Sequence, residues 1–328
     1  MNNEQRPVLK NGHIDMPIDE SINLCAEIDK LRKKKNAVIL AHYYTTDEVQ
    51  QIADYTGDSL GLAQQAAKTD ADIILFAGVH FMAETAKVLC PNKKVLIPDL
   101  ATSCSLADSV NEKALAECIK QHPGHTVISY VNTTAEVKAL TDIVVTSSNA
   151  VKIVSQLPKD EKIIFGPDRN LGAYVKKVTG RENMVIWDGG CHVHDGFSVE
   201  KLRELKEQHP NAKVLAHPEC PQEILDLADH IGATSYLLKM SEEQPDNEFI
   251  VATEPGIFYE MKKRSPQKTF IPVPSKSGHP LNMCVNMKRN SLKKIYLTLK
   301  YEFPEVDLPK HIAEKAVVCI NRMMEMSK

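Results

Sequence analysis

An internal repeat constrains the fold of this 328-residue chain more than any other feature. His42, Tyr130 and His217 each end a short apolar run, and they stand 88 and 87 positions apart. One cysteine follows each of them, 62, 61 and 67 positions further on: Cys104, Cys191 and Cys284. A period of this length is too long for a solenoid repeat. The spacing therefore predicts three homologous domains.

The composition of each repeat predicts its fold class. Apolar, β-branched runs at 37–44, 71–78 and 94–100 alternate with helical patterns such as 46–57. The same order restarts at 125–134 and again at 212–220, where 221–232 is the helical pattern. Buried strands alternating with helices are typical of parallel α/β units. We therefore expect an α/β protein of three homologous domains with short parallel sheets.

Domain boundaries follow from the repeat. We expect the first α/β repeat over 20–106, the second over 107–193 and the third over 194–287. The C-terminal helices, within 288–328, are expected to pack onto the first repeat, because the last one carries an apolar stripe.

The polar residues at the strand ends indicate where a site should lie. Ligands of open parallel sheets bind beyond the carboxyl ends of the strands, where loops enter helices. A pseudo-threefold arrangement with these ends facing inward would bring the three repeated cysteines to one centre. Their shared phase in the repeat has no other explanation in the sequence.

The spacing of the cysteines bears on the metal they would hold. The chain has no C-x-x-C pair, which zinc sites commonly use, although a Cys3His zinc site with His192 or His194 stays open. Three thiolates at one centre favour a [4Fe-4S] cluster. Such a cluster would keep one iron without a protein ligand, and that open iron would act as a Lewis acid.

Other features exclude several classes of protein. The net charge of -3 argues against binding nucleic acid, and no apolar run approaches the ~20 residues of a membrane span. The first fifteen residues show no signal-peptide pattern, so we expect a cytoplasmic protein without a disulfide framework. Cys25, Cys118 and Cys319 lie in helical apolar patterns and are expected to be buried. Cys220 follows a strand and stays a candidate ligand.

Nine motifs, in order, resemble the quinolinate synthase family over nearly the whole chain. They are "AHYYT", "GDSL", "PDLATSCSLADS", "YVNTTAEVKA", "TSSNA", "WDGGCHVHDG", "HPEC", "GATS" and "CVNMKRNSL". One departure is that some members carry C-x-x-C-x-x-C around the last cysteine, whereas Cys284 stands alone here.

The resemblance implies condensation of iminoaspartate with dihydroxyacetone phosphate to quinolinate, with loss of phosphate and two waters, in de novo NAD biosynthesis. It implies a [4Fe-4S] cluster held by Cys104, Cys191 and Cys284, and L-aspartate oxidase as the supplier of iminoaspartate. By motif position, the substrate-binding residues would be His42, Ser59, Tyr130, Asn132, Ser147, His194, His217, Glu219 and Thr234.

Acid-base groups are needed for the proton transfers and the eliminations of water. The candidates are Tyr44, Glu219, His217 and Tyr130. Of these, His217 and Glu219 stand two positions apart at a strand end, so their side chains are expected to point the same way, as a paired acid and base must. Two alternatives stay open. One is a non-catalytic iron-sulfur sensor or carrier, which would need a fourth thiolate from Cys220. The other is Cys191 as a nucleophile with His194 as its base.

Overall fold

The structure, a computed structural model, describes residues 7–328 and divides into two compact units. Unit 1 contains the chain up to Cys104 together with Val285–Ala313, and unit 2 contains Ser105–Cys284 and Glu314–Lys328. Within residues 7–328, no helix combines the length and the apolar composition that a membrane crossing requires.

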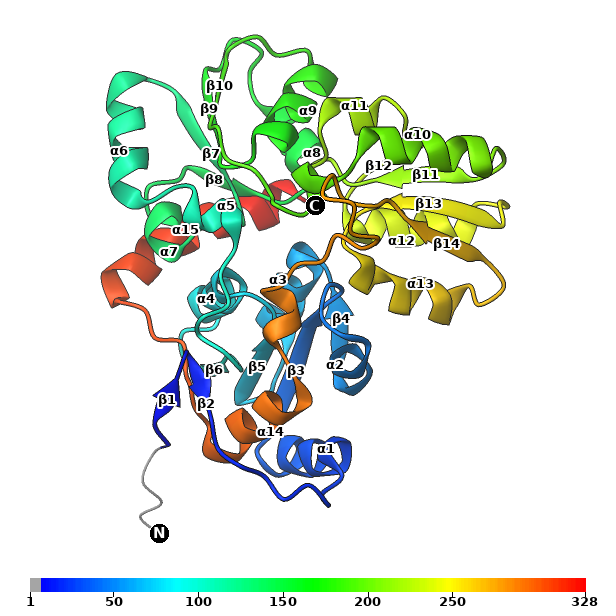
Figure 1. The fold of residues 1–328 in the computed structure, drawn as a ribbon. Coiled ribbons are helices and arrows are strands. Elements are labelled where there is room, and N and C mark those ends of the chain that lie inside the picture. The colour runs from blue at the N-terminus through cyan, green and yellow to red at the C-terminus, as the bar shows by residue number, and fades with distance from the viewer. Residues whose placement is uncertain (1–6) are drawn as a thin grey trace. The chain divides into compact units, whose positions relative to one another are not determined.

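Unit 1 contains one parallel sheet, a short hairpin and the helices that cover them (Figure 1). Its strands are β1 (Leu9–Lys10), β2 (His13–Ile14), β3 (Ala37–His42), β4 (Tyr55–Gly57), β5 (Ile73–Ala77) and β6 (Lys94–Leu96). Its helices are α1 (Leu24–Lys34), α2 (Asp47–Ile52), α3 (Ser59–Lys68), α4 (His80–Leu89) and α14 (Leu292–Tyr301), with the 3₁₀ turn η3 (Met287–Arg289).

Unit 2 contains two parallel sheets. Its strands are β7 (Thr126–Tyr130), β8 (Ile143–Val145), β9 (Ile163–Gly166), β10 (Met184–Ile186), β11 (Lys213–Ala216), β12 (His230–Ile231), β13 (Glu248–Ala252) and β14 (Thr269–Pro272). Its helices are α5 (Ser105–Asp108), α6 (Glu112–Gln121), α7 (Ala135–Lys138), α8 (Ala150–Gln156), α9 (Arg169–Thr179), α10 (Val199–Gln208), α11 (Gln222–Leu225), α12 (Thr234–Glu243) and α13 (Phe258–Arg264). The 3₁₀ turns η1 (His194–Gly196) and η2 (Pro255–Ile257) complete it, and most of α15 (Lys310–Met326) belongs to it.

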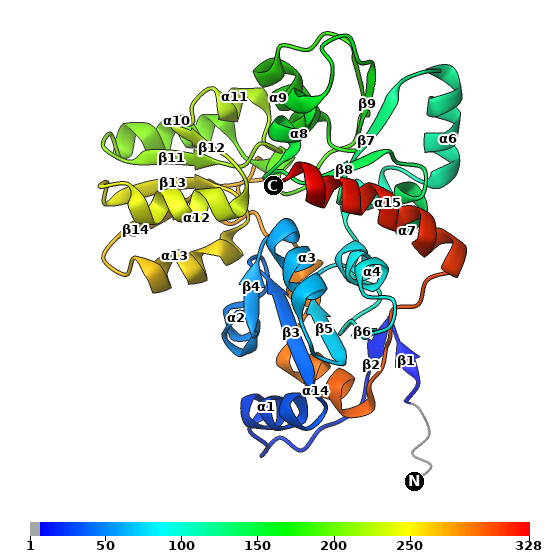
Figure 2. The ribbon, with the colours of Figure 1, turned by 180° about the vertical axis from the view of Figure 1, so that it is seen from behind.

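The three parallel sheets have one topology, which confirms the α/β repeat. Their strand orders are β4-β3-β5-β6, β8-β7-β9-β10 and β12-β11-β13-β14. In each repeat the second strand lies outside the first, and the third and fourth follow on the other side (Figure 2). The direction of connection reverses between the first and third strands, and that edge is where doubly wound sheets bind ligands. The arrangement of the repeats around a common axis stays a prediction.

An aspartate repeats with the same period and the same contact. Asp54, Asp142 and Asp229 stand 88 and 87 positions apart. Each side chain accepts a hydrogen bond, 2.8 Å long, from the backbone N–H fifteen residues earlier, in the first strand of its repeat. This bond fixes where the second strand begins against the first, and it shows that the period extends to local backbone contacts.

A cation before the fourth strand repeats in the same way. Lys93, Arg181 and Lys268 are again 88 and 87 positions apart. Each donates to carbonyl oxygens at the end of the second helix of its repeat, including Thr69 O at 2.8 Å, Val154 O at 2.8 Å and Gln244 O at 2.6 Å. The carbonyls at a helix C-terminus have no partner within the helix, so a cation there satisfies them.

Two helical patterns expected from the sequence end earlier than predicted. The pattern at 46–57 gives α2 only to Ile52, after which Tyr55–Gly57 is strand β4. The pattern at 221–232 gives the short helix α11, and His230–Ile231 is strand β12. Strands of two or three residues are too short to show alternation in a sequence, so the helical patterns that precede β4 and β12 extend over them.

The two C-terminal helices pack on different repeats. Helix α14 packs on the first sheet, where Ile295 and Leu299 share a core cluster with Ile39. The expectation that α15 also packs there is wrong. Residues of α15 and the tail bond to the second repeat, as Cys319 Sγ does to Lys138 O at 3.3 Å. An apolar stripe predicts that a helix is buried, but it does not identify the surface that buries it.

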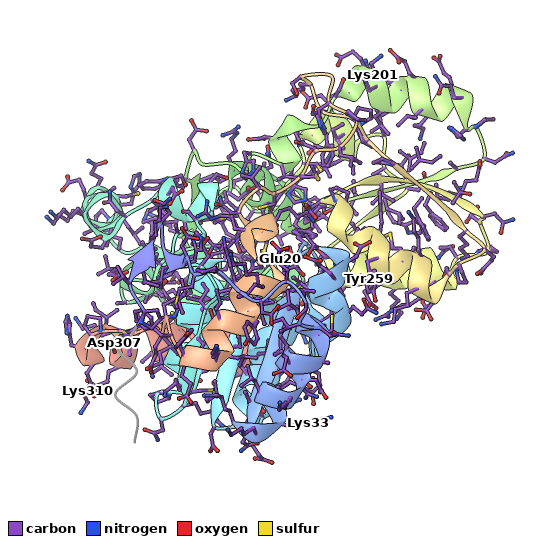
Figure 3. All side chains as sticks on the ribbon, turned by 60° about the horizontal axis from the view of Figure 1, so that its bottom comes forward. Glu20, Lys33, Lys201, Tyr259, Asp307 and Lys310 are labelled. Carbon is purple, nitrogen blue, oxygen red and sulfur yellow. The ribbon has the colours of Figure 1, made fainter. Side chains whose placement is uncertain are left out.

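Charged side chains lie on the outer helices. Figure 3 labels Lys33 on α1 and Lys201 on α10, and both are exposed. The basic run at 31–36 ends α1, where Lys33 pairs with Asp29 at 2.6 Å. This run therefore stabilises a helix C-terminus, as cations at that position do.

Replacing Arg181 tests the repeated cation. The side chain is 3% exposed and donates to three carbonyl groups. Arg181→Met removes all of these hydrogen bonds, and only the carbonyls of Val154 and Pro158 keep a backbone donor. We expect a loss of roughly 2–4 kcal/mol in the free energy of unfolding, measured in urea by circular dichroism. The exposed Lys162→Met is the matched control. Equal midpoints for the two variants would contradict a structural role for Arg181.

Candidate active site

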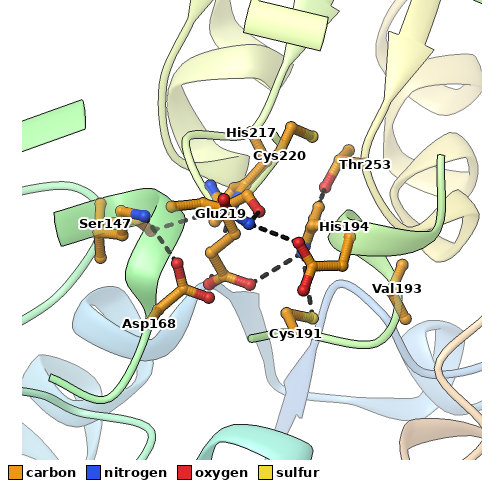
Figure 4. A network of polar contacts seen from close by, with 12 residues as sticks. Ser147, Asp168, Cys191, Val193, His194, His217, Glu219, Cys220 and Thr253 are labelled. Atoms are coloured by element: carbon orange, nitrogen blue, oxygen red, sulfur yellow. Dashed lines mark hydrogen bonds and ion pairs between the residues drawn. The ribbon is translucent and has the colours of Figure 1, made fainter. Parts of the chain in front are cut away.

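Polar side chains from both sheets of unit 2 meet where the strands end (Figure 4). Tyr130 ends β7, Ser147 follows β8, and His217 and Glu219 follow β11. Because the sheets are parallel, their topology places these residues at the edge where ligands bind. The sequence predicted all four as site residues.

Glu219 is the centre of this network. It is 3% exposed, its Oε1 accepts a hydrogen bond from the Tyr130 hydroxyl, and its Oε2 lies 2.8 Å from His194 Nδ1. Burial alone would raise the pKa of Glu219. The charges of His217 and His194, with the hydrogen bonds from His194 and Tyr130, outweigh burial and hold that pKa well below its usual range. The group is therefore a carboxylate at neutral pH.

Two histidines stack beside this carboxylate. The rings of His194 and His217 are 4.5 Å apart and 24° from parallel. His217 Nε2 lies 3.2 Å from Ser147 Oγ, and His217 Nδ1 lies 3.3 Å from the backbone N–H of Glu219. Both histidines are buried, so each ring is held by polar contacts that set its orientation.

Tyr130 acts as a donor in this site. Burial, and then the charge of Glu219, raise the pKa of Tyr130 well above its ordinary value. The phenol therefore keeps its proton at neutral pH and donates a hydrogen bond to the carboxylate of Glu219.

Three residues that the sequence reasoning missed also belong to the network. Thr253 Oγ1 lies 3.0 Å from His194 Nε2, and Asn170 Nδ2 donates to the carbonyl of Glu219 at 3.0 Å. Asp168 is fully buried, and burial followed by the charge of Glu219 raises its pKa well above the usual range. Asp168 and Thr253 follow the third strands of their repeats. The topological switch point would have indicated them.

Cys191 and Cys284 both pack against the core of the third repeat. Cys191 Sγ lies 3.3 Å from His194 Nδ1, and the backbone N–H of Cys284 donates to Glu254 Oε1 at 3.1 Å. Both are partly exposed cysteines in loops and form no disulfide, which suits cysteines that bind a metal centre. Cys104, the third expected ligand, is also partly exposed and outside any disulfide, and it ends the first segment of unit 1.

The other cysteines differ from these three. Cys220 is fully buried, and burial raises its thiol pKa well above the usual value, so it is poorly suited to supply a fourth thiolate. Cys319 is buried as expected, and its burial raises its pKa to about 11. Cys118 is only half-buried, and the expectation for Cys25 is wrong, because Cys25 is exposed.

Unit 1 holds the remaining predicted residues of the first repeat. His42 ends β3, and its Nδ1 accepts a hydrogen bond of 3.1 Å from the backbone N–H of Tyr44. The two rings meet edge to face at 4.5 Å, and Lys288 donates to the Tyr44 carbonyl at 2.7 Å. Ser59 opens α3, whose N-cap is Asp58.

A pocket of about 530 Å³ lies next to the network in unit 2. Its lining includes Ser147, Tyr174, Pro218, Tyr236 and Lys239. Ser147 also contacts His217, so the pocket reaches the network through this serine.

The last two predicted site residues, Asn132 and Thr234, also lie where a strand ends or a helix begins. Asn132 is half-buried in the loop after β7, and the buried Thr234 opens α12, beside the pocket residues Ala233 and Ser235.

The raised pKa of Tyr130 predicts its behaviour in an alkaline titration. A folded-state pKa above the unfolded value of 10.0 stabilises the folded protein below pH 10, and this contribution is lost as the pH rises further. Near pH 10 Tyr130 is still protonated and adds no phenolate absorbance. The absorbance formed at that pH should therefore be the same in the parent and in Tyr130→Phe. A deficit of one tyrosine in nine in the variant would show that Tyr130 titrates normally.

Comparisons with known proteins show which family this chain resembles over almost its whole length. The family model described as "Quinolinate synthetase A protein" matches residues 26–325. A quinolinate synthase of Synechocystis sp. is 57% identical over 305 residues, which cover 93% of this chain and 96% of that protein. One of Gloeothece citriformis is 53% identical over 325 residues, 99% of this chain and 98% of that protein. One of Thermosynechococcus vestitus is 54% identical over 307 residues, which cover 93% of this chain and 96% of that protein.

Proposed function

The chain belongs to the quinolinate synthase family, and we propose that it condenses iminoaspartate with dihydroxyacetone phosphate to give quinolinate, with loss of phosphate and two waters. The observation that carries this proposal is the buried network of Tyr130, Glu219, His194 and His217. It brings a carboxylate, a phenol and two imidazoles together, and these are the groups that such proton transfers require.

The proposed cofactor is a [4Fe-4S] cluster. Its ligands would be Cys104, Cys191 and Cys284, which are partly exposed cysteines on loops and form no disulfide. When bound, a cluster with one iron open supplies a Lewis acid for an oxygen atom of the substrate.

Hydroxyl, amide and imidazole groups would bind the anionic substrates. Both substrates carry carboxylate or phosphate groups, which such donors and the first N–H groups of a helix can hold. Ser59 and Thr234 stand at the first positions of α3 and α12, and Ser147 lines the pocket. His42, Asn132 and Tyr130 are assigned to the same role on their motif positions.

Glu219 is the proposed proton acceptor. Its low pKa keeps it ionised, and its bonds to His194 and Tyr130 fix its direction. Tyr130, which stays protonated, is a donor, and His217, held by Ser147, is the second acid-base group. Tyr44 is proposed as a further donor from the first repeat.

Two further proposals concern the cellular setting. The protein would act in the cytoplasm, and L-aspartate oxidase would supply iminoaspartate. Measuring quinolinate formation from aspartate with both enzymes present would test this supply.

The contact between Cys191 and His194 supports a second candidate mechanism. The 3.3 Å between Sγ and Nδ1 is within the reach of a thiol nucleophile and its base. In that mechanism Cys104 and Cys284 have no role, so single replacements of the three cysteines separate the two mechanisms.

The cysteine replacements test the cofactor. Without oxygen, Cys104→Ser, Cys191→Ser and Cys284→Ser should each lose most of their iron, sulfide and quinolinate formation, whereas Cys220→Ser should keep all three. If only Cys191→Ser loses activity, the nucleophile mechanism is correct. If Cys220→Ser also loses the cluster, the open-iron proposal fails.

Replacements in the network test the acid-base roles. Glu219→Gln keeps the shape of the side chain but cannot accept a proton, so we expect kcat to fall about 10²–10⁴-fold, measured as quinolinate formed without oxygen. Ser147→Ala, at the edge of the pocket, should mainly raise KM. The iron content of both variants should equal that of the parent. A kcat for Glu219→Gln within a few-fold of the parent would contradict the role of Glu219.

A further inference from the structure

We propose that Cys191, His194 and Glu219 form a second metal site, which binds one Zn²⁺ ion when the cluster is absent. The three residues each offer one ligand atom, and these atoms all lie within 4.8 Å of one another. This proposal extends the proposed function, because Cys191 would belong to both metal centres. The cluster would also use Cys104 and Cys284, whereas the zinc ion would also use His194 and Glu219.

The distances between the ligand atoms suit a tetrahedral ion. With zinc–nitrogen and zinc–sulfur bonds of about 2.0 and 2.3 Å, neighbouring ligand atoms stand roughly 3.5 Å apart. His194 Nδ1 lies 3.3 Å from Cys191 Sγ and 2.8 Å from Glu219 Oε2. Small side-chain rotations would therefore bring the three atoms around one ion, with the fourth position open to water.

The local backbone places these ligands in advance. Cys191 and His194 belong to one tight turn, in which the backbone N–H of Asp195 donates to the Cys191 carbonyl at 2.9 Å. Glu219 follows β11, and its neighbour Asn170 donates to its carbonyl at 3.0 Å. A metal site formed on an ordered turn and a strand end needs little rearrangement to bind its ion.

Residues around the ligands also have the arrangement of a metal site. Metal-bound histidines donate from their second nitrogen to a neighbouring acceptor, and His194 Nε2 lies 3.0 Å from Thr253 Oγ1. Ligand carboxylates accept further hydrogen bonds, and Glu219 accepts one from Tyr130 on the oxygen that does not face His194. His194 and Glu219 are 2% and 3% exposed, so bulk water competes poorly for the ion.

The donor set selects the kind of ion. One thiolate, one imidazole and one carboxylate suit Zn²⁺, whereas Mg²⁺ and Ca²⁺ prefer oxygen alone. Binding breaks the S–H bond of Cys191 and places a neutral Nδ1 on the ion. One proton is released from the thiol, and a second is released if His194 is protonated.

Sharing Cys191 makes the two metal centres mutually exclusive. Protein loaded with one equivalent of Zn²⁺ should therefore take up less iron and sulfide on reconstitution, and chelation of the zinc should restore the uptake. The proposed site is thus a point at which zinc prevents cluster assembly.

Co²⁺ binding to the iron-stripped, full-length protein tests the proposal. Without oxygen, one equivalent should bind, with thiolate-to-cobalt charge-transfer absorption that Zn²⁺ removes. Cys191→Ser should abolish this absorption, and His194→Gln and Glu219→Gln should each weaken binding more than tenfold. Thr253→Val should weaken it about tenfold, as the loss of a residue that orients a ligand does. Circular dichroism must show that each variant is folded.

Matched cysteine variants separate this proposal from the proposed function. Cys104→Ser and Cys284→Ser, which should lose the cluster, should bind Co²⁺ as the parent does. If they lose Co²⁺ binding as Cys191→Ser does, the ion is held by the three cysteines and the proposal is wrong. Unchanged binding in His194→Gln and Glu219→Gln would also overturn it. Iron and sulfide contents of the same variants test the cluster independently.

Discussion

The ionised side chain of Glu219, buried among hydrogen-bond donors, is the constraint on which the site in unit 2 depends. An isolated buried carboxylate would be costly, and it remains charged here because Tyr130 and His194 each contact one of its oxygens. Tyr130 ends a strand of the second repeat, whereas Glu219 follows a strand of the third. The bond between them therefore joins the two sheets of unit 2 at their functional edges.

The repeated topology explains how such a site arises from ordinary parts. Each repeat has the same strand order, and each carries a polar side chain at the end of its first strand. His42 and Tyr130 are the last residues of β3 and β7, and His217 directly follows β11. The repeated aspartates and cations hold the backbone of each copy in the same way. The side chains at the strand ends differ between the copies, and these differences supply a phenol, an imidazole and a carboxylate.

Much of this was predictable from the sequence, and the failures have physical reasons. The spacing of His42, Tyr130 and His217 predicted the α/β repeat, because a shared fold preserves the positions of strand ends. Strands β4 and β12 escaped prediction because they are only three and two residues long. Thr253 was missed because one threonine after an apolar run carries no pattern of its own, and only its place after a third strand, at the topological switch point, indicates it. Its role depends on His194, 59 positions away in the sequence.

A double-mutant cycle between Tyr130 and Glu219 tests the central claim most directly. The free energy of unfolding in urea would be measured for the iron-stripped parent, Tyr130→Phe, Glu219→Gln and the double variant. A hydrogen bond to a buried charge predicts a coupling energy of about 1.5–3 kcal/mol between the two replacements. Effects that add to within about 0.5 kcal/mol would show that the two side chains act independently, and would contradict this account of the site.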